Sequence, residues 1–190
     1  MKKSLGKKMI VFPQPVMLVG TYDENGKEDV MNVAWGGQCG PAQISFSLSK
    51  AAGHQTTANL EKQHAFTIAY ADEAHLIPAD YVGLVSGKNT PDKMEKSGFT
   101  FTESSSVHAP VINELPLSLS CRVVSMKEEF GEIRVTGEVT ETYADESILD
   151  ENGTVNADMM HLITLDAASG SYRRIGEKAG KAFHDGMKLR

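Results

Sequence analysis

Four side chains of this sequence carry the donors and charges that suit a phosphate group: Ser49, Lys50, Thr56 and Lys93. A dianionic phosphate is best held by several N–H or O–H donors together with one or two cations. A helix is expected to begin at His54, and the free N–H groups at a helix start add to an anion site. We interpret this set as a candidate phosphate site. The alternative is a surface loop in which Thr56 caps the helix and the lysines are solvated.

Trp35, the only tryptophan, directly precedes Gly36 and Gly37. Glycine has no Cβ, so a ligand or a second segment of backbone can approach closely there. A lone tryptophan is most often a core residue because it buries much apolar area. Its position at a strand end beside a glycine break favours the rim of a pocket instead. Together with the phosphate site, this predicts that residues 32–59 hold the ring and phosphate of a nucleotide-like cofactor.

Other kinds of catalytic site have little support. The six histidines and two cysteines lack the spacing of a metal site, and no hydrolase elbow, P-loop or Rossmann glycine motif is present. Asp80 and Asp92 are isolated carboxylates and make no acid–base pair. Cys39 and Cys121 are expected to be free thiols in a reducing cytoplasm, with Cys39 structural. The sequence therefore predicts no metal site and no catalytic residue.

The composition indicates one globular domain over residues 1–190. A net charge of −6 argues against a nucleic-acid partner, which would require a basic face. The N-terminus lacks the apolar stretch of a signal peptide, and no run approaches the roughly 18 apolar residues of a membrane span. We expect a cytoplasmic protein without a membrane partner.

The elements that must position these residues are mainly β-strands. Short apolar or alternating runs predict strands at residues 16–21, 29–35, 42–48, 65–70, 117–127, 133–143 and 162–165. Helical spacing predicts helices at residues 54–62, 73–85, 92–96 and 178–186. Six or seven short strands with two or three inserted helices indicate a small β-barrel decorated by helices, with an open sandwich as the alternative.

Several motifs, in order along the chain, resemble those of the flavin reductase-like family, and of its flavoredoxin branch in particular. They are Pro15-Val16 with Val19-Gly20-Thr21, Asn32-Val33-Ala34-Trp35, Ser47-Leu48-Ser49-Lys50, His54-Gln55-Thr56 with Asn59, Ser86-Gly87 with Asp92-Lys93, Cys121-Arg122-Val123, and Tyr172 with Ile175-Gly176. The resemblance covers about residues 13–183. Each motif is short, and the specificity lies in the ordered set.

The resemblance implies an FMN-binding split β-barrel that works as a homodimer, with each flavin near the subunit interface. It implies that four consecutive residues line the flavin: Asn32, Val33, Ala34 and Trp35. It assigns the phosphate to Ser49, Lys50, Thr56 and Lys93. Contacts from Gln55, Asn59, Ser86 and Tyr172 are also carried over.

The sequence departs from the family pattern at two places. Many relatives have a Pro-Pro pair where this chain has Cys39-Gly40-Pro41-Ala42, which affects the shape of the ring pocket. They have arginine where this chain has Lys50, which keeps the cation but loses the bidentate fork of arginine.

The leading functional hypothesis is an FMN-dependent oxidoreductase that takes hydride from NADH or NADPH, as a flavin reductase does. The first alternative is a non-enzymatic FMN electron carrier of the flavoredoxin type, which serves a redox protein partner. A further alternative is a binding module on the same barrel whose ligand has changed to haem or a deazaflavin. The sequence reveals no nicotinamide site that would separate these hypotheses.

Overall fold

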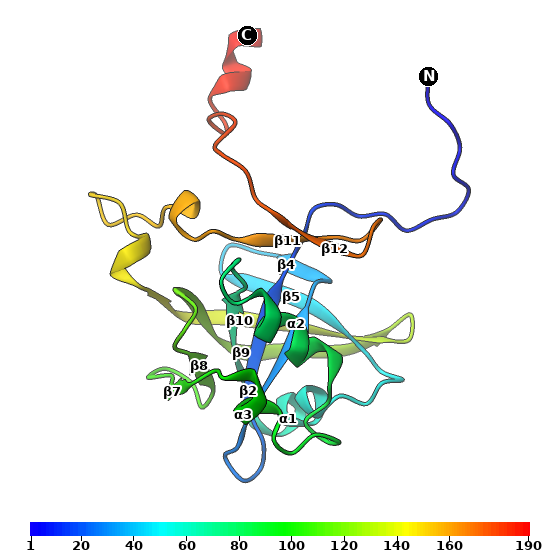
Figure 1. The fold of residues 1–190 in the computed structure, drawn as a ribbon, viewed down its shortest axis with the longest axis vertical. Coiled ribbons are helices and arrows are strands. Elements are labelled where there is room, and N and C mark those ends of the chain that lie inside the picture. Colours follow the sequence, from blue (N-terminus) through cyan, green and yellow to red (C-terminus); the bar gives the residue numbers. More distant parts are fainter.

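A computed structural model describes all residues 1–190, and an antiparallel seven-stranded sheet forms its centre (Figure 1). The strand order is β3-β2-β6-β9-β10-β5-β4. The strands are β2 (Met17–Tyr22), β3 (Glu28–Val33), β4 (Gly36–Gln38), β5 (Gln43–Ser49), β6 (Ala65–Tyr70), β9 (Leu117–Glu129) and β10 (Glu132–Ala144). The predicted strands at residues 16–21, 29–35, 42–48, 65–70, 117–127 and 133–143 are confirmed within a few residues.

Tight turns set the register of the long hairpins. Between β2 and β3, Gly26 adopts a φ of 77°, and the Asp23 carboxylate accepts hydrogen bonds from the N–H groups of Asn25 and Lys27. Phe130 and Gly131 join β9 to β10 with φ values of 55° and 82°. These left-handed conformations suit hairpin turns.

The sheet must curl because its two edge strands are neighbours in the chain. β3 and β4 lie at opposite ends of the strand order, yet only Ala34 and Trp35 separate them in sequence. The N–H of Ser47 on β5 donates to the carbonyl of Trp35 at 2.9 Å. The sheet is therefore a barrel that nearly closes at the Ala34–Trp35 connection.

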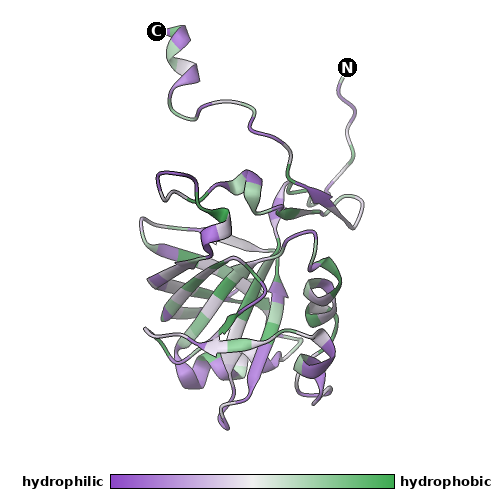
Figure 2. Ribbon diagram, turned by 60° about the vertical axis from the view of Figure 1, so that its left-hand side comes forward, coloured by the Kyte–Doolittle hydropathy of each residue, from purple (hydrophilic) through white to green (hydrophobic).

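Both faces of the sheet are packed around β2, all six residues of which are buried. Met17 and Val19 belong to an inner core that includes Phe46 and Phe66, and Leu18 belongs to an outer one. This alternation follows from the two-residue period of a strand. Figure 2 shows hydrophobic residues gathered along the middle of the sheet.

Three helices cover the barrel near β2 and β3: α1 (Gln55–Gln63), α2 (Leu76–Leu84) and α3 (Lys93–Ser97). Leu60 of α1 packs into the inner core, whereas Ala79, Val82 and Met94 pack into the outer core. α3 ends at Gly98, which adopts a φ of 74°. The predicted helices at residues 54–62, 73–85 and 92–96 are thus confirmed, with α2 starting three residues later than expected.

Shorter elements complete the chain. β1 (Gln14–Pro15), β11 (Ile163–Asp166) and β12 (Ser171–Arg174) form one small sheet, and β7 (Phe101–Glu103) and β8 (Pro110–Ile112) form another. The strand at 162–165 is confirmed as β11. The prediction of a helix at residues 178–186 is wrong, since the structure has only a 3-10 turn at Asp185–Leu189.

Both terminal segments project away from the barrel (Figures 1 and 2). No helix has the length and apolar character needed to cross a membrane.

Candidate functional site

Two adjoining hollows lie where β3, β5 and the starts of α1 and α3 meet. The larger, which we call the polar cavity, has a volume of about 270 Å³. The smaller, the Trp35 groove, has a volume of about 210 Å³. Met31 and His54 line both hollows, so a ligand can extend from one into the other.

Nine of the twelve cofactor residues predicted from the sequence line these hollows. The groove is lined by Asn32, Val33, Ala34, Trp35 and Ser49. The polar cavity is lined by Gln55, Thr56, Ser86 and Lys93. Lys50, Asn59 and Tyr172 line neither hollow.

Ser49, at the end of β5, was predicted to hold the phosphate and lines the Trp35 groove.

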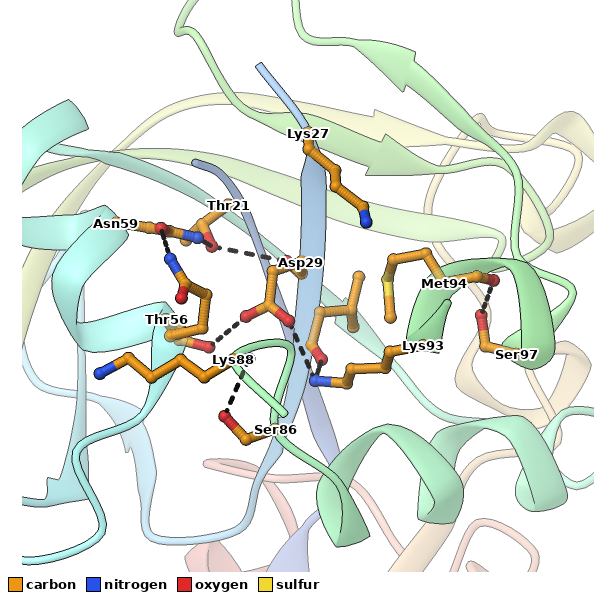
Figure 3. A network of polar contacts seen from close by, with 12 residues as sticks. Thr21, Lys27, Asp29, Thr56, Asn59, Ser86, Lys88, Lys93, Met94 and Ser97 are labelled. Carbon is orange, nitrogen blue, oxygen red and sulfur yellow. Dashed lines mark hydrogen bonds and ion pairs between the residues drawn. The ribbon is translucent and has the colours of Figure 1, made fainter. Parts of the chain in front are cut away.

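A buried ion pair forms the floor of the polar cavity (Figure 3). The Lys93 ammonium lies 3.0 Å from Oδ1 of Asp29 and donates to the carbonyl of Val30 at 2.6 Å. The Thr56 hydroxyl donates to Oδ2 of Asp29 at 2.9 Å. Asp29, Thr56 and Lys93 are only 4%, 1% and 3% exposed. Thr56 therefore neither caps α1 nor has a free proton, and Lys93 is not a solvated surface lysine.

Backbone geometry brings the loop after α2 onto this ion pair. A Cβ added to Gly87 would lie 2.8 Å from Oδ1 of Asp29. Only a residue without a side chain lets the loop approach so closely. Ser86, next to Gly87, is thereby placed at the wall of the cavity.

A second network of side-chain hydrogen bonds connects the first turns of α1 to β2. The Asn59 amide donates to the Thr21 hydroxyl at 2.9 Å, and the Gln55 amide donates to Oδ1 of Asn59 at 2.8 Å. Asn59 is buried, and its side chain links Gln55, at the wall of the polar cavity, to Thr21 on β2.

The start of α1 opens onto the polar cavity without a side-chain cap. His54 occupies the N-cap position and makes no capping hydrogen bond with its side chain. The first N–H groups of a helix have no partner within the helix and carry a partial positive charge. Burial, and then the charge of Lys93, lower the pKa of His54 below its ordinary value of 6.5. The cavity is thus suited to an anion.

The Trp35 groove combines an exposed aromatic ring with the ends of two strands. Trp35 is 60% exposed, as expected of a residue at a pocket rim. The Asn32 amide donates to the carbonyl of Ala79 on α2 at 2.9 Å. This contact requires Gly83, because an added Cβ there would lie 2.9 Å from the Asn32 Cβ. Ser49 and Glu132, directly opposite each other on β5 and β10, complete the groove.

Two predicted site residues have other partners in this structure. The Lys50 ammonium lies 2.6 Å from Oε2 of Glu128, and both side chains are exposed. The Tyr172 hydroxyl donates to Oδ1 of Asp80 at 2.7 Å. Burial and the Asp80 carboxylate raise the pKa of Tyr172 to about 12.

The sequence reasoning did not identify Asp29, Met31, His54 or Glu132 as site residues. Asp29 had a detectable signal, since it lies beside Val30 in a predicted strand, and a carboxylate that is buried there requires a partner. Met31 and Glu132 had none, because each looks like an ordinary strand residue.

Comparison with known proteins places the chain in one family. Residues 9–173 match the family model of the flavin reductase like domain. The flavoredoxin of Desulfovibrio vulgaris (Miyazaki F) is 34% identical with a TM-score of 0.91, covering 98% of this chain and 100% of that chain. Flavoredoxin from Methanosarcina acetivorans is 28% identical with a TM-score of 0.89, and the whole length of both chains is covered.

A protein with a split barrel domain from Shewanella frigidimarina NCIMB 400 is similar in fold alone. It is 19% identical with a TM-score of 0.78, covering 90% of this chain and 87% of that chain. No curated protein matches the sequence. Because the family model spans most of the chain and a flavoredoxin is similar over nearly all of it, the chain belongs to the flavin reductase-like domain family and has a split-barrel fold.

Proposed function

We propose that this protein binds FMN, with the phosphate in the polar cavity and the ring system in the Trp35 groove. One observation carries the proposal: an anion-suited cavity and an aromatic-rimmed groove adjoin at Met31 and His54. A flavin mononucleotide has the same two-part chemistry, with an anionic end and a flat aromatic end. The similarity to two flavoredoxins over nearly the whole chain supports the same ligand.

The donors around the polar cavity fit a phosphate. The free N–H groups at the start of α1 and the Ser86 hydroxyl are neutral donors at its walls. An ammonium has three N–H donors, and Lys93 gives two of them to Asp29 and Val30. The third remains for a phosphate oxygen.

Lys50 and Ser49 remain part of the proposed phosphate set. Lys50 is held only by an exposed ion pair with Glu128. Such a surface pair is worth about 0–1 kcal/mol, so a dianionic ligand can compete for the lysine. Asn59 would act by positioning Gln55, and Tyr172 by supporting the α2 side of the groove through Asp80.

We further propose that the protein is an oxidoreductase that uses NADH or NADPH, acts as a cytoplasmic homodimer and comprises one domain over residues 1–190. A bound flavin supplies hydride acceptance and electron transfer, while the protein binds it, orients it and limits its exposure to water. We assign no catalytic acid or base. The flavoredoxin similarity favours a second candidate, an FMN electron carrier that serves a redox protein partner.

The two candidates differ in where their electrons come from. The protein is loaded with FMN in the absence of oxygen, NADH and then NADPH are added, and the flavin absorbance band is followed. Free FMN in the same buffer is the control. Bleaching much faster than in the control supports the reductase. A band that persists with both nucleotides but bleaches with dithionite supports the carrier.

A further test concerns the ligand itself. A protein that purifies without colour and gives no binding signal with FMN would contradict both candidates. Titration with haem and a deazaflavin would then identify a changed ligand on the same barrel.

A further inference from the structure

Glu132, the first residue of β10, has a carboxylate oxygen without any partner. Its Oε2 atom is buried and accepts no hydrogen bond, and no ion pair involves the residue. The other glutamates near this turn are paired: Glu128 with Lys50, and Glu129 with Arg134. A carboxylate removed from water without a donor costs free energy, so an unpartnered one requires an explanation.

The position of Glu132 supplies that explanation. It lines the Trp35 groove together with His54, the residue shared with the polar cavity. Its charge acts on His54, where it opposes the stronger effects of burial and Lys93 on the imidazole pKa. Glu132 thus lies beside the junction of the two hollows.

A ligand that occupies both hollows must cross this junction with the chain that joins its two ends. In FMN that chain is a polyol, whose hydroxyl groups are neutral hydrogen-bond donors. An ionised carboxylate is an acceptor with two oxygens and no donor. Hydroxyl groups therefore match Glu132, whereas a phosphate would be repelled by it.

We propose that Glu132 accepts hydrogen bonds from the hydroxyl groups of the polyol chain, and that it selects ligands that carry such a chain. This inference rests on the proposed function. It assigns to Glu132 a recognition role distinct from the phosphate and ring contacts.

Three flavins separate the contacts: FMN, riboflavin without the phosphate, and lumiflavin without the polyol chain. Dissociation constants are measured by quenching of flavin fluorescence for wild type, Glu132→Ala and Glu132→Gln. Glu141→Gln is the matched control, because Glu141 is exposed on the same strand and has no partner. The thermal midpoint of each ligand-free variant is also measured.

Glu132→Ala is expected to weaken riboflavin and FMN binding by the same factor, about tenfold or more, the range for a hydrogen bond to a charged group. Lumiflavin binding should not change. Glu132→Gln, which keeps the shape and one acceptor, should give a smaller loss. The ligand-free midpoint should rise in Glu132→Gln, since the charge on a carboxylate with one buried, unpartnered oxygen is removed. A merely structural residue would lower the midpoint.

Two results would overturn the inference while leaving FMN binding intact. One is unchanged riboflavin affinity in both variants. The other is an equal loss for lumiflavin, which would assign Glu132 to the shape of the groove. If wild type binds none of the three flavins, the proposed function fails as well, so the two failures are distinguishable.

Discussion

At the scale of single residues, the main feature of the site is that Asp29 organises two of the predicted phosphate ligands. Thr56 gives its only hydroxyl proton to Asp29, and Lys93 lies against the same carboxylate. Asp29 and Lys93 are 64 positions apart in the sequence. Residue types alone pointed to Thr56 and Lys93, both of which line the polar cavity. They could not reveal the carboxylate, because its pairing depends on how α3 packs against β3.

The Thr56–Asp29 hydrogen bond should contribute measurably to stability. Thr56→Val keeps the shape and leaves Oδ2 of Asp29 without its donor, so the free energy of unfolding should fall by about 1–3 kcal/mol. Thr57→Val is the matched control, because the Thr57 hydroxyl is buried without a partner. The control should be neutral or stabilising. Urea unfolding measures both, and a Thr56→Val variant as stable as wild type would contradict this role.

His54 should make stability depend on pH. Burial, followed by Lys93 and Lys88, lowers its pKa, while Asp29 and Glu132 oppose that effect. The folded state then binds fewer protons than the unfolded chain just below the ordinary pKa of 6.5. The contribution of His54 is therefore present above this pH and is lost as the pH falls through it.

The measurement compares the unfolding free energy of wild type and His54→Gln over a pH series. The wild type should lose more stability than the variant as the solution becomes acidic. An NMR titration of the imidazole gives the pKa directly. A pKa above the ordinary value would show the opposite sign and refute the assignment.

At the scale of elements, the sequence predicted best those segments that have a long apolar periodicity and pack against the core. The central strands and α1 were found because apolar residues recur at the period of each element. β4, β7 and β8 have three residues each, too few to show a period. The helix expected at 178–186 is absent. Its residues are exposed, and most helical stability in proteins comes from packing.

A glycine on β10 tests how tightly the barrel is packed. A Cβ at Gly137 would lie 2.7 Å from Cε1 of the buried Phe66, whose ring meets Phe46 edge to face. Gly137→Ala should therefore destabilise the protein by about 1–3 kcal/mol through overpacking. Gly37→Ala is the control, since nothing lies within 4 Å of its Cβ. Equal unfolding midpoints for the two variants would show that the barrel relaxes around the added carbon.

At the scale of the whole molecule, large apolar side chains are exposed at the two hollows and along α2. Trp35, Ile77 and Leu84 are 60%, 80% and 74% exposed. Trp35 lines the groove and Leu84 lines the polar cavity. Exposed apolar groups of this kind favour an interface with another molecule. They support the proposed homodimer, with the flavin site near the contact between subunits.

Light scattering at micromolar concentration should give the mass of a dimer. Ile77→Asp on α2 should shift the mass toward the monomer, because a charge would be buried at the interface. Phe183→Asp, in the C-terminal segment after β12, is the control for an exposed apolar residue away from the two hollows and should leave the mass unchanged. A wild-type monomer that still binds FMN tightly would contradict the dimer.

The central claim is that FMN binds with its ring at Trp35 and its phosphate at the polar cavity. Trp35 is the only tryptophan, so its fluorescence reports on the groove alone. The most direct measurement titrates the protein with FMN and with riboflavin while following this fluorescence. We predict saturable quenching by both ligands, with FMN binding more tightly. Fluorescence that does not respond to either flavin, or equal affinity for both, would contradict the account.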